Sequence, residues 1–197
     1  MASSLGQALI LLINTVGGIF LLAVLLRFLL QATGADFYNP VSQAIVKLTS
    51  SSLRPLRRII PGFRGLDFAA LVLALLVNTL ASALMVFAAG FALPDLGTLI
   101  SWAFVGILAF ILNIYFYGLL ISIIASWIAP YSGNPILMLV QQLMEPLQSL
   151  FRRVIPPMGG LDFSPIFIFL GIQMLEIIFI ANFVRGLRLP AQLVIGV

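Results

Sequence analysis

The sequence predicts an all-α integral membrane protein with four transmembrane helices, arranged as two parallel repeats of a span, an amphipathic helix and a second span. Composition indicates the class, because 62% of the 197 residues are hydrophobic and 8% are charged, whereas soluble domains carry about 25% charged residues. The second observation is a set of apolar runs long enough to cross a bilayer. The third is a polar twelve-residue motif that occurs twice.

Four apolar runs reach the roughly 20 residues that a helix needs to cross the hydrocarbon core. They cover, in chain order, residues 8–30, 68–93, 99–129 and 163–184. A tight turn at 94–98 joins the second run to the third, whereas the other two connections are long. The N-terminal sequence MASSLGQ has no basic residue before the first apolar run. We therefore expect this run to be retained as a span and not cleaved as a signal peptide.

The motif RRIIPGFRGLDF, at residues 57–68, returns as RRVIPPMGGLDF at residues 152–163. The pair Asn39-Pro40 recurs at the same spacing as Asn134-Pro135. The chain is therefore interpreted as a duplication. Repeat 1 covers residues 1–93 and repeat 2 covers residues 99–197. Each repeat has two spans, so both insert in the same orientation, as parallel repeats related by an axis along the membrane normal.

Each long connection is predicted to contain an interfacial amphipathic helix, over about 39–53 and about 134–151. Asparagine followed by proline is a strong helix start, because asparagine caps the helix and proline suits its first position. In the second copy, apolar residues recur at spacings of three and four, with polar residues on the opposite face. Such a helix would lie in the membrane interface. A shallow re-entrant hairpin is the alternative.

The positions shared by the two motif copies have structural interpretations. The arginines favour the cytoplasmic side and can bind lipid phosphate, the prolines end the helix, the glycines permit a turn, and the aspartates cap the next span. The functional interpretation is a paired surface that binds anionic lipid headgroups or a partner protein. The candidate residues are Arg57, Arg58, Pro61, Gly65 and Asp67, with Arg152, Arg153, Pro156, Gly159, Gly160 and Asp162.

Basic residues indicate the orientation. Seven of the ten Lys and Arg residues lie in the two long connections. The positive-inside rule therefore predicts that these connections are cytoplasmic and that both termini lie outside. Arg185 and Arg188, in the C-terminal tail, oppose this orientation.

Several polar side chains lie at membrane depth within the predicted spans, among them Asn14, Asn78, Asn113, Gln173 and Glu176. The four amides occupy paired repeat positions, so we expect them to face inward and to hydrogen-bond between helices; a pore lining is the alternative. Glu176 has no acidic counterpart in repeat 1, and an ionisable residue at membrane depth is a candidate functional group. Arg27 lies near the cytoplasmic end of its span. We expect it to extend to the headgroups and not to meet Glu176.

The chain contains no cysteine and no histidine. Disulfides, thiolate or imidazole metal sites and histidine acid–base chemistry are therefore excluded. No cofactor and no direct contact with nucleic acid is expected. An enzyme is the class of protein least favoured by these residues.

The doubled pattern, most complete at residues 152–163 and continuing into Ser164-Pro165, resembles the YggT family of small bacterial inner-membrane proteins, which has plastid relatives. The first copy departs from it at residues 62–65 and at Ala69-Ala70. The resemblance implies a link to osmotic or ion stress tolerance. Its relatives are associated with cell division and, in plastids, with nucleoid distribution and maturation of a b-type cytochrome. It supplies no established active site.

Two functions follow from these patterns. The first is a non-catalytic scaffold or assembly factor that binds lipids and membrane-protein partners through the cytoplasmic arginines. The second is a small oligomeric ion channel or transporter, with Glu176 and the amides along its path.

Overall fold

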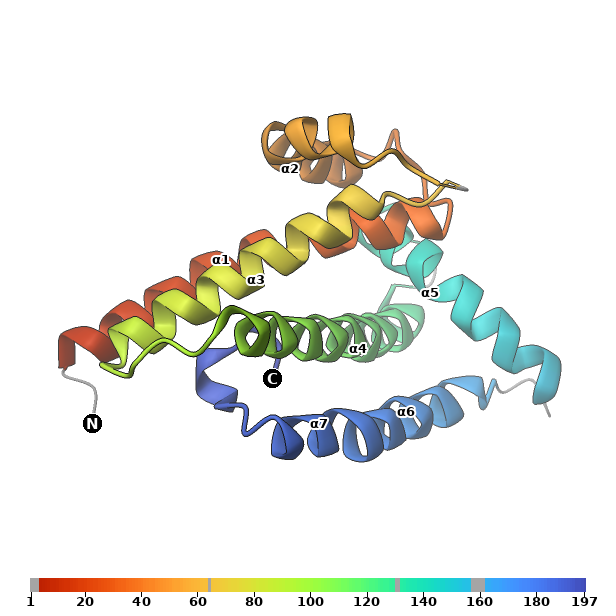
Figure 1. The fold of residues 1–197 in the computed structure, drawn as a ribbon. Helices are drawn as coiled ribbons and strands as arrows, with labels where there is room; N and C mark the ends of the chain where they lie inside the picture. The colour runs from red at the N-terminus through yellow and green to blue at the C-terminus, as the bar shows by residue number, and fades with distance from the viewer. Residues whose placement is uncertain (1–3, 64, 130–131, 157–161) are drawn as a thin grey trace.

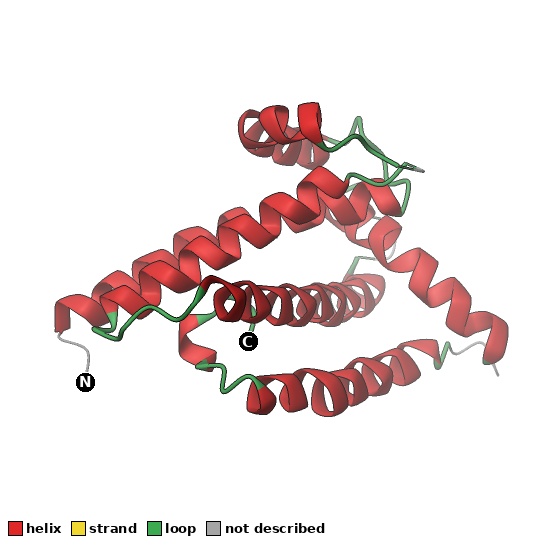
Figure 2. Cartoon of the chain, in the orientation of Figure 1, coloured by secondary structure: helices red, strands yellow, loops and turns green. Residues whose placement is uncertain are grey.

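The computed structural model describes residues 4–63, 65–129, 132–156 and 162–197, which form helices and connecting loops without a β-strand (Figure 2). Four helical stretches are long and apolar enough to cross a membrane. The elements are α1 (Ser4–Ala32), α2 (Pro40–Ile59), α3 (Phe68–Ala88), α4 (Leu96–Ile128), α5 (Pro135–Val154), α6 (Ser164–Leu175), the π-helical segment η1 (Glu176–Ile180), α7 (Ala181–Gly186) and the 3₁₀ turn η2 (Ala191–Leu193).

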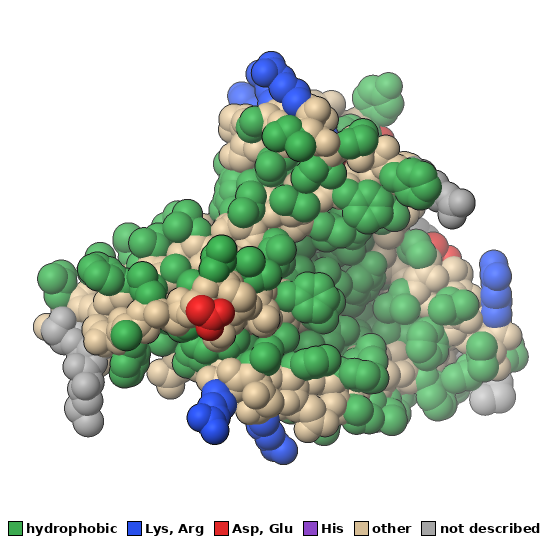
Figure 3. All heavy atoms as spheres, viewed as in Figure 1, with side chains coloured by type: hydrophobic (Ala, Val, Ile, Leu, Met, Phe, Trp, Pro, Cys, Tyr) green, Lys and Arg blue, Asp and Glu red, His purple; other side chains and the backbone are tan. Residues whose placement is uncertain are grey.

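The long apolar helices lie alongside one another. Helices α1 and α3 are the most closely packed pair, and α3 also packs against α4 (Figure 1). The helices α2 and α5 lie toward the end of the molecule where α1 ends and α3 begins (Figure 1). Apolar side chains cover most of the visible surface, and the cationic ones stand out in separate places (Figure 3). This is the surface expected of a multi-pass membrane protein, because hydrocarbon surrounds the spans.

The turn between the second and third spans begins earlier than predicted. Helix α3 ends at Ala88, not at residue 93, and Gly90 follows with φ of 79°. A glycine in this left-handed conformation is a common helix terminator, because it has no Cβ. Helix α4 then begins at Leu96, where Asp95 Oδ1 accepts a hydrogen bond from the Thr98 amide at 3.0 Å.

The predicted starts of both amphipathic helices are confirmed. The side chains of Asn39 and Asn134 each accept a hydrogen bond from the amide two residues later, at 2.9 Å. Both helices extend further than predicted, to Ile59 and Val154, so that each arginine pair lies in a last helical turn. Each is a single continuous helix and not a hairpin.

The C-terminal segment after α7 turns back and packs among the spans. The side chains of Leu189, Leu193, Val194 and Ile195 are buried. The Trp102 indole donates a hydrogen bond to the carbonyl of Leu187 at 3.1 Å. Backbone that is not helical is tolerated at membrane depth where protein groups satisfy its hydrogen bonds. The spans therefore supply donors to this segment, as described below.

Small residues make room for the C-terminal segment. A Cβ added at Gly106 would lie 2.6 Å from the Ile195 carbonyl oxygen and 2.7 Å from Asn78 Nδ2. A Cβ added at Gly196 would lie 2.3 Å from the Gly106 carbonyl oxygen. Helix α4 and the segment thus touch backbone to backbone, which only glycine permits at these positions.

We predict that Gly106→Ala destabilises the protein, because the added methyl group overlaps backbone atoms of the C-terminal segment. Overpacking of this kind costs about 1–3 kcal/mol. The measurement is thermal unfolding in detergent. Gly171→Ala is the matched control, since that helical glycine has open space around its Cβ position. Equal melting temperatures for the two variants would contradict the packing described here.

Candidate functional site

The two motif copies form the same contact. In the first copy, Arg57 near the end of α2 forms an ion pair with Asp67, the residue before α3. Arg57 Nε donates to Asp67 Oδ2 at 3.2 Å, and its terminal NH2 group makes a shorter contact with the same oxygen. The Asp67 side chain is only 5% exposed, whereas that of Arg57 is 41% exposed. This ion pair holds the end of α2 against the start of α3.

The second copy pairs the equivalent residues. Arg152 Nε donates to Asp162 Oδ2 at 2.8 Å, and Arg152 also contacts Gln148 and Glu145. Burial pushes the pKa of Asp162 upward, but hydrogen bonds from Arg152 and Ser164 outweigh it, so that this pKa lies below its usual value. The hydrogen bond to Asp162 raises the pKa of Arg152. We call the two ion pairs, Arg57–Asp67 and Arg152–Asp162, the clasps.

The clasps change the interpretation of the aspartates. Asp162 accepts a hydrogen bond from the Ser164 amide at 2.9 Å, as expected of a residue that caps α6. The predicted cap at Asp67 is wrong, because its side chain forms no capping hydrogen bond. In that copy the carboxylate forms an ion pair with Arg57 instead.

The arginine pairs divide into two kinds of residue. The first arginine of each pair belongs to a clasp, while Arg58 and Arg153 are exposed and form no ion pair within the described part of the chain. Pro61 and Pro156 are exposed beyond the helix ends.

The turn after α2 brings Arg57 and Asp67 together. Gly65 has φ of 81°, so it provides the predicted turn, and its carbonyl accepts a hydrogen bond from Gln31 at 2.9 Å. Gly159 and Gly160 lie outside the described residues.

Arg27 does not extend to the headgroups as predicted. It is 4% exposed, and its NH1 group donates to Thr49 Oγ1 at 2.7 Å, to Ser50 Oγ at 3.1 Å and to the Val46 carbonyl at 3.1 Å. These acceptors lie on α2, so Arg27 binds α1 to the amphipathic helix. Sequence reasoning missed this network. The available signal was a threonine on the apolar stripe of α2, between Ile45 and Leu53.

The two halves meet at their repeated helix starts. The Asn39 side chain caps its own helix and also donates a hydrogen bond to the Pro135 carbonyl of α5 at 2.8 Å. Nearby, the Asp36 amide donates to Gln142 Oε1 at 2.9 Å. The Asn-Pro pair therefore has a second role, because its first copy binds its second copy.

The four amide side chains predicted to face inward differ in burial and in their hydrogen bonds. Asn78 is buried and donates to the carbonyls of Ala103, at 3.1 Å, and Ile195, at 3.2 Å. Asn113 donates to the Gly196 carbonyl at 3.3 Å. Two amides therefore bind the C-terminal segment. The prediction that all four face inward is wrong for Asn14 and Gln173, which are exposed.

Glu176 lies at the start of the π-helical segment η1 and is partly buried. Within the described residues it forms no salt bridge, and Arg27 is engaged elsewhere. Single-turn π segments inside α-helices are frequent at functional sites. The backbone irregularity and the unusual side chain therefore coincide at this position.

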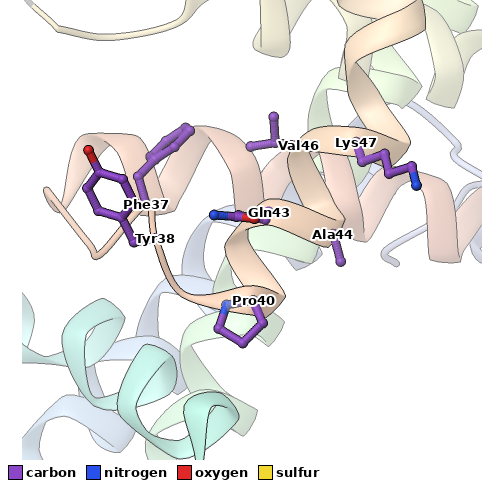
Figure 4. A pocket seen from close by; sticks show the side chains of 7 residues that line it. All are labelled: Phe37, Tyr38, Pro40, Gln43, Ala44, Val46 and Lys47. Atoms are coloured by element: carbon purple, nitrogen blue, oxygen red, sulfur yellow. The ribbon is translucent and has the colours of Figure 1, made fainter.

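An open pocket of about 730 Å³ lies beside the start of α2 (Figure 4). Phe37 and Tyr38 reach it from the preceding loop, and Gln43, Val46 and Lys47 from the first two turns of the helix. Tyr38 is 87% exposed. Aromatic side chains gather at membrane–water interfaces, so this edge of α2 suits that depth. Within the described residues, no cluster of acidic side chains could hold a metal ion.

These contacts define a multi-pass membrane protein in which two amphipathic helices are each tied by an ion pair to the start of the following span. The chain belongs to the CCB3/YggT family, whose sequence model matches it twice, over residues 6–88 and 101–183. The resemblance inferred from the doubled motif is thus confirmed.

Bacterial and plant proteins are similar to this chain. The uncharacterized protein PA0392 of Pseudomonas aeruginosa is 44% identical over 96% of both chains. The uncharacterized protein YggT of Escherichia coli is 36% identical over 81% of this chain and 82% of its own. The chloroplastic YlmG homolog protein 2 of Arabidopsis thaliana is 41% identical over 30% of this chain and 23% of its own. No solved structure matches.

We predict that Arg57→Gln destabilises the protein more than Arg152→Gln. Loss of Arg57 leaves the buried Asp67 carboxylate without its charged partner, which costs about 1–3 kcal/mol. The Asp162 side chain is 30% exposed, and an exposed pair contributes about 0–1 kcal/mol. Unfolding of the purified variants in detergent measures both costs. Adding Asp67→Asn to Arg57→Gln should restore part of the loss, and a double variant no more stable than the single one would contradict this assignment.

Acid should weaken the second clasp. The pKa of Asp162 is lower in the folded protein, so its contribution to stability is present above the unfolded value of about 3.9 and is lost as the pH falls through the folded value. We expect the stability difference between the wild type and Asp162→Asn to stay constant from pH 7 to about pH 5 and to shrink below about pH 4. Unfolding measured across this range tests it, and a difference independent of pH would contradict it.

Proposed function

We propose that this protein is a non-catalytic scaffold or assembly factor of the bacterial inner membrane, linked to envelope organisation and to osmotic or ion stress tolerance. In this proposal both long connections face the cytoplasm and both termini face the opposite side. Anionic headgroups surround the amphipathic helices, and membrane-protein partners bind above them.

The observation that carries the proposal is that the two arginines of each pair have different roles. The clasps fix the ends of α2 and α5 against the following spans, and the next residue, Arg58 or Arg153, is exposed. A charged group presented on a fixed backbone loses less conformational freedom on binding than one on a mobile loop. The same presentation occurs once in each half, which suits a partner with acidic groups.

A second candidate function is a small oligomeric ion channel or transporter. The observation that favours it is the partly buried Glu176 at a π-helical segment, with Gln173 exposed three residues before it. Polar groups that face outward from a span are costly in lipid. A second copy of the chain packed on this face would cover them.

We predict that Arg58→Gln combined with Arg153→Gln reduces growth under osmotic stress to the level of a strain that lacks the gene, because the partner surface loses both exposed cations. The scaffold predicts that Glu176→Gln complements fully. The matched control is Lys47→Gln combined with Arg54→Gln, which removes two exposed cations elsewhere on α2. Full complementation by the arginine variant would contradict the scaffold.

Ion flux through the wild type and Glu176→Gln distinguishes a channel from a scaffold. Potassium and sodium flux into liposomes should match that of empty vesicles if the protein is a scaffold. Flux that requires the protein and falls in Glu176→Gln would instead establish the conducting function.

A further inference from the structure

A cavity of about 500 Å³, open to the surface, lies between the end of α1, the end of α2 and the turn that follows. Its volume is more than ten times the roughly 30 Å³ that a water molecule occupies in the liquid. Of the described residues that line it, three carry charge and one carries an amide. These lining residues are Arg27, Gln31, Phe37, Arg57, Gly62 and Asp67.

The charges around this cavity do not cancel. Asp67 pairs with Arg57. Arg27 is buried, and its hydrogen bonds go to neutral oxygens of α2, while no carboxylate among the described residues lies within salt-bridge distance of it. Its Nε atom is buried without a hydrogen-bond partner. A buried charge is costly unless an opposite charge or a set of hydrogen bonds compensates it. Among the described residues, the lining therefore has an excess of one positive charge.

The chemistry of the lining favours a phosphate group. Guanidinium groups bind phosphate oxygens with strong, charge-assisted hydrogen bonds, in a planar geometry that ammonium groups lack. A phosphodiester carries one negative charge, which matches the excess of one positive charge. Arg27 lies five residues before the end of α1, or about 7–8 Å along the helix axis, at the end of this helix to which α2 is bound.

The second half has different residues at the positions equivalent to the Arg27 network. In the repeat alignment, Ser126 stands opposite Arg27 and Met144 stands opposite Thr49. Met144 is buried, and a Cβ added at Gly118 would lie 2.7 Å from its terminal carbon. Apolar packing thus replaces the arginine network between α4 and α5. Among the described residues, the buried arginine belongs to the first half.

We propose that the cavity between α1 and α2 binds a phosphate group, held by Arg27 and Arg57. Two sources carry this chemistry, the headgroup of a phospholipid and free inorganic phosphate. The proposal goes beyond the scaffold function, because it uses neither Arg58 nor Arg153.

The test is thermal unfolding of the full-length protein, purified in a neutral detergent and titrated with four probes. Dioleoyl phosphatidylglycerol in mixed micelles is compared with dioleoylglycerol, which has the same acyl chains and no phosphate. Sodium phosphate is compared with sodium chloride at equal ionic strength. The variants are Arg27→Gln and Phe37→Trp, the second of which fills space at a half-exposed position without changing charge. Arg54→Gln is the matched control, because it removes one exposed cation from α2 outside the cavity.

We expect a phosphate-bearing probe to raise the melting temperature of the wild type and of Arg54→Gln. In Arg27→Gln and Phe37→Trp, the concentration needed for the same shift should rise about tenfold or more, as expected for loss of a charge-assisted hydrogen bond or of the space for the ligand. A shift with phosphatidylglycerol alone identifies a lipid headgroup, and a shift with sodium phosphate identifies a free anion.

The proposal is overturned if neither phosphate-bearing probe stabilises the wild type beyond its control. It is also overturned if Phe37→Trp responds like Arg54→Gln, a comparison that remains available if Arg27→Gln does not fold. The scaffold function and the phosphate site can fail independently. The test of the scaffold replaces Arg58 and Arg153, whereas the test of the phosphate site replaces Arg27.

Discussion

The ion pair between an arginine and an aspartate ten residues further along the chain is the restraint that both halves of this protein apply to their amphipathic helices. It is made once in each half, as Arg57–Asp67 and as Arg152–Asp162. An amphipathic helix at a membrane surface has no backbone partner that fixes its direction. The pair supplies that restraint by joining the end of the helix to the start of the next span. In the first copy the chain between the two charges turns at Gly65, which has φ of 81°.

The halves share this restraint and differ in how the amphipathic helix is joined to the preceding span. In the first half a buried arginine reaches from α1 to a threonine and a serine on α2. In the second half Met144 packs against Gly118. Polar networks of this kind fix one geometry, because a displaced partner leaves a buried charge unsatisfied. Apolar contacts tolerate small displacements more readily. In the first half this network holds Arg27 in one position, beside the proposed phosphate site.

Local patterns predicted much of this fold. The spans follow from runs of apolar residues, and the starts of α2 and α5 follow from an asparagine that caps its own helix. These signals need only a few neighbouring residues. The contacts that sequence reasoning missed join distant segments, such as Asn39 with Pro135 or Asn78 with Ile195. The spacing of residue types along the chain does not indicate which distant segments come together. Repeat symmetry also predicted that Gln173 faces inward, because it occupies the position paired with Asn78. This prediction is wrong, since Asn78 is buried and Gln173 is exposed.

The segment after α7 has a consequence for the order in which the protein is made. Asn78 and Asn113 enter the membrane with α3 and α4, and Ala103 of α4 accepts one hydrogen bond from Asn78. The carbonyls of Ile195 and Gly196, which accept the others, leave the ribosome only after α6 and α7. Until then the bonds to this segment cannot form, and an unsatisfied polar group is costly in hydrocarbon. Insertion of the four spans and completion of the fold are thus separate events, and the second must await translation of the residues that follow the last span.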